Sequence, residues 1–186
     1  MYYLLYIFLN IFLLMFLTDI NHTNGLGTPG KIIQLTNQYD FCLIMPQHPY
    51  QTIGESEGNA IAKCLPNARH PSGAKTMVPG TIVSAHFEMT NDYVQITGLL
   101  DHSYAELVPG DDGGQYDDAL GGSEPLSQCE GFGSYVEILS WDRFCVRCCH
   151  TEETGPESPC NMHRDTEGCF EVIGGSYGPG FTYADK

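Results

Sequence analysis

The sequence predicts a single small α+β domain, mainly antiparallel β, that is stapled by disulfides and carries two or three short helices. Three observations predict this fold class. The chain has 186 residues, which fits one domain, and it contains eight cysteines. Gly and Pro number 21 and 11, so turns are abundant. Between those turns lie short segments rich in β-branched and aromatic residues, which are typical of strands.

The first part of the chain predicts export from the cell. Residues 2–17 read YYLLYIFLNIFLLMFL, an almost continuous apolar run. The run is shorter than the roughly 20 residues that a membrane span needs, and it fits the apolar region of a signal peptide. We therefore expect a signal peptide over 1–20, a flexible linker over 21–30 and a secreted cysteine-rich domain over 31–186. An uncleaved membrane anchor is the alternative for the first segment.

The linker also begins with a glycosylation sequon, Asn21-His22-Thr23, which is usable only if cleavage falls before it. Acids outnumber bases 23 to 8, which gives a formal net charge of -15. This charge repels nucleic-acid phosphates and anionic lipids. We expect no nucleic-acid partner, and no membrane partner after the signal is removed.

Elements in the first half follow from local pattern. Residues 31–36 read as a strand and 42–45 as a short apolar run that ends at Pro46. A helix is predicted over 56–65, where Ser56 is a plausible cap and the apolar residues have helical spacing. Residues 81–89 and 93–100 are strands separated by a turn-rich tripeptide, which predicts a hairpin.

Elements in the second half are shorter. A strand is predicted over 104–108, a Gly/Asp loop over 110–125 and another strand over 133–139. Ser140 is the expected cap of a helix that carries the clustered cysteines. Residues 169–173 form a possible strand, followed by Gly-rich turns.

An even number of cysteines behind a signal peptide implies oxidised pairs. Eight cysteines allow 105 pairings. On a helix, Cys145 and Cys149 share one face, and a chain reversal at the Gly/Pro-rich 154–159 segment allows Cys149–Cys160 to nest inside Cys145–Cys169. Each bond would stabilise the fold by about 2–4 kcal/mol.

Zinc is the alternative use of this cluster. Cys145-x2-Cys148 followed by Cys160-x2-His163 has metal-ligand spacing. We favour disulfides, because in an oxidising compartment disulfide formation consumes the thiols first.

Four carboxylates on the flexible Gly/Asp loop are a candidate calcium site. They are Asp111, Asp112, Asp117 and Asp118. Calcium binds several oxygens at about 2.4 Å, which such a loop can supply. The alternating ligands and final Glu of an EF-hand are missing, so a solvated acidic turn is the favoured interpretation.

No catalytic residue is assigned. Glycoside hydrolysis needs two carboxylates about 5–10 Å apart, a spacing that some pair among 23 acids always satisfies. Asp101 and His102 are adjacent on a strand end, where side chains point to opposite faces. His86 lies within the hairpin and is expected to be a hydrogen-bonded structural residue. The sequence does not contain His-Glu-x-x-His.

Aromatic residues are the remaining candidates for a sugar-stacking or protein-binding surface. We expect Trp141 to pack against the sheet. The tyrosines considered for the surface are Tyr93, Tyr104, Tyr116, Tyr135, Tyr177 and Tyr183.

Six segments also carry a family resemblance. They are 40–46 (DFCLIMP), 54–64 (GESEGNAIAKC), 77–98 (MVPGTIVSAHFEMTNDYVQITG), 107–118 (LVPGDDGGQYDD), 140–149 (SWDRFCVRCC) and the C-x8-C of Cys160–Cys169. In order and spacing they resemble the fungal secreted macrophage-activating glycoprotein-like family. This resemblance implies a fungal, extracellular protein and no established enzymatic activity.

The departures from the family suggest a disulfide pairing. The family has the C-x3-C of Cys145 and Cys149, usually has no cysteine at the position of Cys148, and tends to lack a partner for Cys129. Two extra cysteines suggest that they pair with each other. The resemblance thus implies four pairs, Cys42–Cys64, Cys129–Cys148, Cys145–Cys169 and Cys149–Cys160.

Together these observations predict a non-catalytic extracellular interaction protein whose partner is a host or cell-wall protein or polysaccharide. The alternatives are an extracellular polysaccharide-acting hydrolase and a calcium- or zinc-binding structural module. An enzyme requires a concave pocket where two acids or a His converge, whereas a binding module presents an aromatic or acidic patch.

Overall fold

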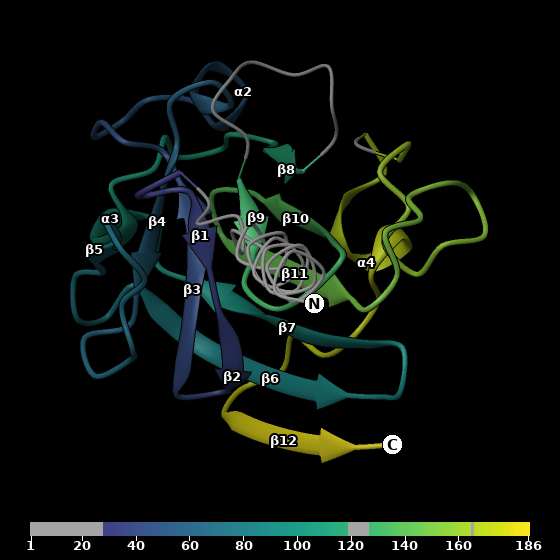
Figure 1. The fold of residues 1–186 in the computed structure, drawn as a ribbon. Helices are drawn as coiled ribbons and strands as arrows, with labels where there is room; N and C mark the ends of the chain where they lie inside the picture. The colour runs from purple at the N-terminus through teal and green to yellow at the C-terminus, as the bar shows by residue number, and fades with distance from the viewer. Residues whose placement is uncertain (1–27, 119–126, 165) are drawn as a thin grey trace, which may run out of the picture.

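A computed structural model describes residues 28–118, 127–164 and 166–186 (Figure 1). The predicted signal peptide, most of the linker and the sequon at Asn21 lie outside the described residues, so the predicted boundaries stay predictions. The structure confirms the α+β fold class, with three sheets and three short helices in the described part of the chain. None of the helices described is long and apolar enough to cross a membrane.

The larger sheet has six strands in the order β12-β6-β7-β11-β10-β8. Its neighbours are antiparallel except for β12 and β6, which are parallel. The predicted hairpin is its centre, since β6 pairs with β7 over nearly its whole length. The strands are β6 (Ile82–Met89), β7 (Tyr93–Leu100), β8 (Gly114–Asp117), β10 (Ser134–Leu139), β11 (Arg143–Cys149) and β12 (Phe181–Asp185).

The smaller sheet has four strands in the order β2-β3-β4-β5, and a parallel pair joins β1 to β9. These strands are β1 (Ile32–Ile33), β2 (Leu35–Asn37), β3 (Asp40–Met45), β4 (Ile61–Cys64), β5 (Lys75–Thr76) and β9 (Gln128–Cys129). The three described helices each span about one turn and are α2 (Ile53–Ser56), α3 (His102–Ala105) and α4 (Gly168–Val172).

The core lies between the two larger sheets. Figure 1 shows β2 and β3 crossing in front of the six-stranded sheet, and the rings of Phe41 in β3 and Phe144 in β11 stack at 5.7 Å between centroids. We call the face of the six-stranded sheet toward β3 its inner face and the opposite one its outer face. Side chains alternate between them along each strand.

The chain after β11 covers part of the outer face. Val136 and Ile138 of β10 lie there in a second buried cluster with Cys145 and Cys149. Disulfides tie the covering chain to this face, from Cys145 to Cys169 and from Cys149 to Cys160.

The remaining disulfides lie on the core side. Cys42 pairs with Cys64 between β3 and β4, and Cys129 pairs with Cys148. These four pairs are the same as those that the resemblance implied. All cysteines among the described residues are bonded. The alternative zinc motif therefore has no thiolate ligands.

The predicted cysteine helix is wrong. Residues 143–149 form β11, paired on both sides by β7 and β10, with Ser140 in the preceding turn rather than at a helix cap. The physical reason is burial on both faces, which favours a strand inside a sheet. The prediction that Cys145 and Cys149 share a face survives, because residues four apart also share a face in a strand. Cys148 then points the other way and reaches Cys129.

Four further expectations are corrected. Residues 56–65 form the end of α2 and then β4, because Gly58 and Asn59 interrupt the helix and Cys64 pairs with Cys42 on β3. Residues 104–108 lie in and just after α3, whose N-terminus is capped by the Asp101 carboxylate. Residues 169–173 lie in and just after α4, and 181–185 form β12 where turns were expected.

Candidate functional site

Two of the four aspartates of the predicted calcium site, Asp111 and Asp117, make separate hydrogen bonds in the structure. The Asp111 carboxylate accepts hydrogen bonds from the backbone N–H of Ile53 at 2.8 Å and of Gly113 at 3.0 Å, so it holds the loop against α2. Asp117 Oδ2 accepts from Gln115 Nε2 at 2.7 Å. In the described ranges, no three His, Cys, Asp or Glu side chains are grouped to hold a metal ion. Calcium binding here stays a prediction.

The other titratable candidates are also accounted for by local structure. Asp101 accepts hydrogen bonds from the hydroxyl and the backbone N–H of Ser103, and these bonds lower the pKa of Asp101. The His102 ring makes a T-shaped contact with the Trp141 ring, with centroids 5.1 Å apart. Asp101 and His102 therefore do not form a catalytic pair. His86 is a structural residue, because its ring nitrogens contact Thr182 Oγ1 at 2.7 Å and the carbonyl of Gly178 at 2.9 Å.

A cleft of about 300 Å³ lies between the β10–β11 turn and α4 and tests the hydrolase alternative. Trp141 and Phe170 line it together with Asp112, Asp142 and Glu167. Hydrogen bonds from Arg143 lower the pKa of Asp142, and those from Arg164 lower the pKa of Glu167. A glycosidase needs a general acid whose pKa is raised, which is the opposite shift.

A second groove, of about 410 Å³, runs over the outer face of β6, β7, β11 and β12. Glu88 is the one carboxylate among its described lining residues. It accepts hydrogen bonds from Lys186 Nζ at 2.7 Å and from the Tyr93 hydroxyl at 3.1 Å. A groove with one engaged carboxylate does not supply the acid pair of a glycoside hydrolase.

Arg147 organises this second groove. Its guanidinium donates to the Gln95 side chain and to the carbonyls of Pro159 and Ile173 at 2.7–2.9 Å, and it lies over the Tyr93 ring at 4.2 Å. A single side chain thus joins β7 to two segments of the covering chain.

We expect Arg147→Lys to lower the free energy of unfolding by about 2 kcal/mol, because an ammonium cannot reproduce this planar fork of hydrogen bonds. Urea denaturation measures the change. Arg164→Lys is the control, since Arg164 is more exposed and pairs with Glu167 alone among the described side chains. Equal, negligible losses in both variants would show that Arg147 has no such role.

The carboxyls with raised pKa values lie away from the three clefts described for this molecule. Burial raises the pKa of Glu137 well above its ordinary range, and burial raises that of Asp118 to about 6. Glu137 is fully buried, and neither residue lines a described cleft. Glu137 is therefore inaccessible to a polymeric substrate.

The structure does assemble an exposed group of aromatic rings at one edge of the six-stranded sheet. We call Tyr39, Phe181 and Tyr183 the aromatic strip; their exposed fractions are 60%, 36% and 50%. Tyr39 stacks on Phe181 with centroids 5.4 Å apart and planes 10° apart. Tyr183 stacks on Phe87 at 5.4 Å and 13°. The strip therefore consists of two stacked pairs, of which only Tyr183 lies on a buried ring.

Two elements position the strip. β12 lies at the edge of the sheet in parallel register with β6, which sets Tyr183 beside Phe87 (Figure 1). Phe181 and Tyr183 are two residues apart on a strand and so share a face. Tyr39 comes from the β2–β3 turn, where its backbone N–H donates to Asn37 Oδ1 at 2.8 Å.

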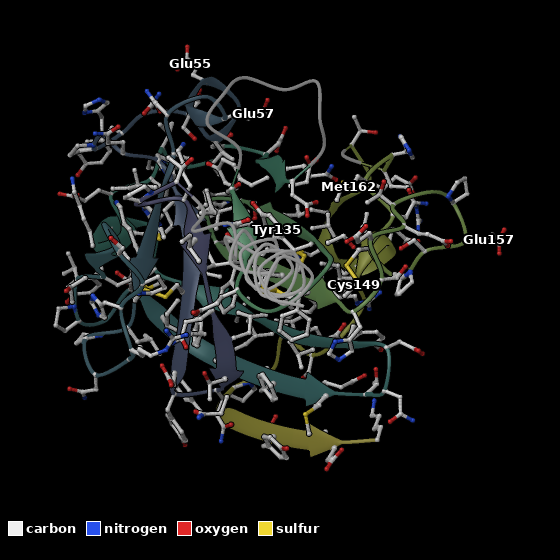
Figure 2. The ribbon with its side chains drawn as sticks, viewed as in Figure 1. Glu55, Glu57, Tyr135, Cys149, Glu157 and Met162 are labelled. Carbon is white, nitrogen blue, oxygen red and sulfur yellow. A yellow bond between two sulfur atoms is a disulfide. The ribbon has the colours of Figure 1, made fainter. Side chains whose placement is uncertain are left out.

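Of the tyrosines singled out from the sequence, Tyr183 and Tyr104 are half exposed. Tyr116 and Tyr135, the latter labelled in Figure 2, instead lie in the core. The Tyr135 hydroxyl contacts the Ser127 hydroxyl. Tyr39 and Phe181 were missed. The alternation of Phe181, Thr182 and Tyr183 is a weak strand signal, but no local signal joins Tyr39 to it.

Comparison with curated proteins finds relatives in the fungus Mycosarcoma maydis. Over 156 residues the chain is 35% identical to "Appressorium protein ROW1", covering 76% of this chain and 35% of that protein. Over 148 residues it is 30% identical to "Appressorium protein ROW2", covering 70% of this chain and 49% of that protein. The chain is therefore similar in sequence to two fungal appressorium proteins.

The chain spans about a third of the length of ROW1 and about half that of ROW2. No family model matches the chain. No solved structure matches it either. Fungal relatives and four disulfides agree with the predicted extracellular setting. The resemblance to macrophage-activating glycoprotein-like proteins stays a prediction.

Proposed function

We propose that this chain is a secreted, non-catalytic fungal binding protein that faces the host or the fungal cell wall and attaches to polysaccharide through the aromatic strip. The observation that carries the proposal is the exposure of Tyr39, Phe181 and Tyr183 in two stacked pairs, Tyr39 on Phe181 and Tyr183 on the buried Phe87. The similarity to appressorium proteins supports a host-facing role.

The chemistry of the strip favours a sugar surface. Exposed aromatic rings that cluster on a soluble protein mark an interaction site. The C–H face of a pyranose is apolar and packs on such rings, while the Tyr39 and Tyr183 hydroxyls remain free to meet sugar hydroxyls at the rim.

Binding to insoluble polysaccharide tests the proposal. The mature protein is sedimented with chitin, β-glucan and cellulose, and the free fraction is measured. We expect at least one polymer to bind, and each of Tyr39→Ala and Tyr183→Ala to weaken that binding about fivefold, the loss for about 1 kcal/mol of ring contact. Tyr50→Ala is the control, because Tyr50 is 64% exposed and lies outside the strip.

Three outcomes would overturn the proposal. Release of soluble sugar from a bound polymer would establish the hydrolase alternative. If the strip variants bind the polymer as tightly as Tyr50→Ala does, the binding site is not the aromatic strip. Retention by host extracellular protein with no retention by the polymers would replace polysaccharide as the partner.

A further inference from the structure

A third cleft, of about 180 Å³, lies where β4 and β5 meet α3, away from the elements that build the aromatic strip. Lys63 and Lys75 line it with Tyr104 and Glu106. The other residues used here are the apolar side chains Met45, Met77 and Val78, and the polar side chains Gln47 and Thr81. We call this cleft the lysine pocket.

The two lysines are unusual among the bases of this acidic chain. All eight bases lie in described ranges, and six of them donate to a protein acceptor. Among the described residues, neither Lys63 nor Lys75 has a hydrogen-bond or ion-pair partner. The chain therefore keeps two ammonium groups unpaired at one place despite its 23 acids.

The lysines also lie directly opposite each other. Lys63 of β4 and Lys75 of β5 are partners in the strand register, so their side chains share a face. Burial and the neighbouring Lys75 charge lower the pKa of Lys63, while the Glu106 carboxylate acts the other way. Like charges opposite each other destabilise a sheet. A bound anion would remove this repulsion.

Tyr104 supplies a ring at the same pocket. The Tyr104 ring packs closely against the backbone of Gly80: a Cβ added at that glycine would lie only 3.3–3.4 Å from the ring atoms. The side chain is nevertheless half exposed. The Thr81 hydroxyl is buried without a hydrogen-bond partner among the described residues. The pocket thus combines an aromatic platform, apolar contacts and an unused polar atom in its lining.

We propose that the lysine pocket binds a uronic acid residue of an acidic polysaccharide, with the lysine pair on the sugar carboxylate and Tyr104 against the sugar ring. Two lysines beside one Glu106 leave a charge of about +1, which matches a single carboxylate better than a phosphate dianion. Gln47 and Glu106 are available to sugar hydroxyls. This inference deepens the polysaccharide part of the proposed function but rests on other residues.

Calorimetric titration of the full mature protein tests the inference. The probes are oligomers of galacturonate and of glucuronate, each paired with its carboxyl-reduced neutral counterpart. We expect a uronate oligomer to bind and its neutral counterpart to bind at least tenfold more weakly. Lys75→Gln, at an exposed position, should weaken uronate binding about tenfold, the loss of one charge-assisted hydrogen bond.

Two further variants fix the direction of the effect. Arg164→Gln removes the same charge elsewhere and should leave uronate affinity unchanged. Glu106→Gln removes the repelling carboxylate and should strengthen uronate binding severalfold. Thermal unfolding of each variant shows that it is folded.

Three outcomes would overturn the inference. The neutral oligomers could bind as tightly as the uronate oligomers, or Lys75→Gln and Arg164→Gln could have equal affinity for uronate. Inorganic sulfate or a glutamate peptide could also bind more tightly than either uronate oligomer. The Tyr183→Ala variant separates this inference from the proposed function. It should keep uronate binding at the lysine pocket while attachment to the insoluble polymer weakens about fivefold. If Tyr183→Ala weakens polymer binding but the parent protein does not bind uronate, the inference about the lysine pocket is wrong. The proposed role of the aromatic strip is then unaffected.

Discussion

The double variant Cys42→Ala/Cys64→Ala is expected to lose about 3 kcal/mol of unfolding free energy. The bond joins β3 to β4 across a sequence separation of 22 residues, and both cysteines are fully buried. Without it, the unfolded chain gains loop entropy and the core loses two sulfur atoms. Because Lys63 immediately precedes Cys64 on β4, loosening this strand should also weaken the lysine pocket.

Urea denaturation at neutral pH measures this loss. Cys149→Ala/Cys160→Ala is the matched control, because its bond spans a separation of 11 residues. The shorter loop predicts a loss that is smaller by about 0.6 kcal/mol from loop entropy alone. If Cys42→Ala/Cys64→Ala unfolds at the same urea concentration as the parent protein, the disulfides are not what stabilises this fold.

Glu137→Gln is expected to stabilise the protein at neutral pH and to flatten the dependence of its stability on pH. Glu137 is fully buried on the inner face of β10. Its Oε2 accepts a hydrogen bond from the Ile44 N–H at 2.9 Å, while its Oε1 has no partner among the described residues. Glutamine keeps the acceptor for Ile44 and removes the ionisable proton.

The sign follows from the raised pKa of Glu137 in the folded state. Above the ordinary carboxyl pKa, the unfolded chain releases a proton that the folded protein retains. The stabilising contribution is therefore complete at low pH and is lost as pH rises toward the folded pKa. Within that window the unfolding free energy falls by about 1.4 kcal/mol per pH unit.

Urea denaturation between pH 4 and pH 8 compares the parent protein with Glu137→Gln. Asp118 has a pKa of about 6 and contributes a slope of the same sign below that pH in both proteins. The difference between the two slopes therefore reports Glu137. Glu157→Gln, at an exposed carboxylate on the periphery (Figure 2), should reproduce the parent slope. Parallel profiles for the parent and Glu137→Gln would contradict the buried, protonated state.

The parts of the fold that sequence predicts are those fixed by local alternation. The β6–β7 hairpin and β10 follow from alternating apolar residues beside turn residues. The strand β11 does not, because apolar residues occupy both alternating sets of its positions, and cysteines four apart share a face in either a helix or a strand. Burial on both faces of the sheet decides between them, and burial is a property of the whole fold.

The candidate sites show the same limit. Tyr183 was recognisable as a surface aromatic, but Tyr39 reaches Phe181 through the pairing of distant strands. Likewise, the parallel register of β4 and β5 sets Lys63 opposite Lys75, and neither lysine belongs to a motif. The aspartates of the predicted calcium site were the most visible cluster in the sequence. In the structure the Asp111 and Asp117 side chains accept hydrogen bonds from backbone and amide groups, and calcium binding stays a prediction.

Both proposed surfaces depend on one oxidised framework, since the Cys42–Cys64 bond holds the strand of Lys63 and the Cys145–Cys169 bond anchors the chain that continues into β12. Mass-spectrometric mapping of unreduced peptides, from protein that eukaryotic cells secrete into their medium, tests this framework most directly. We expect four pairs, Cys42–Cys64, Cys129–Cys148, Cys145–Cys169 and Cys149–Cys160, without free thiols. Free cysteines in folded protein, or retention of the chain inside the cell, would contradict it.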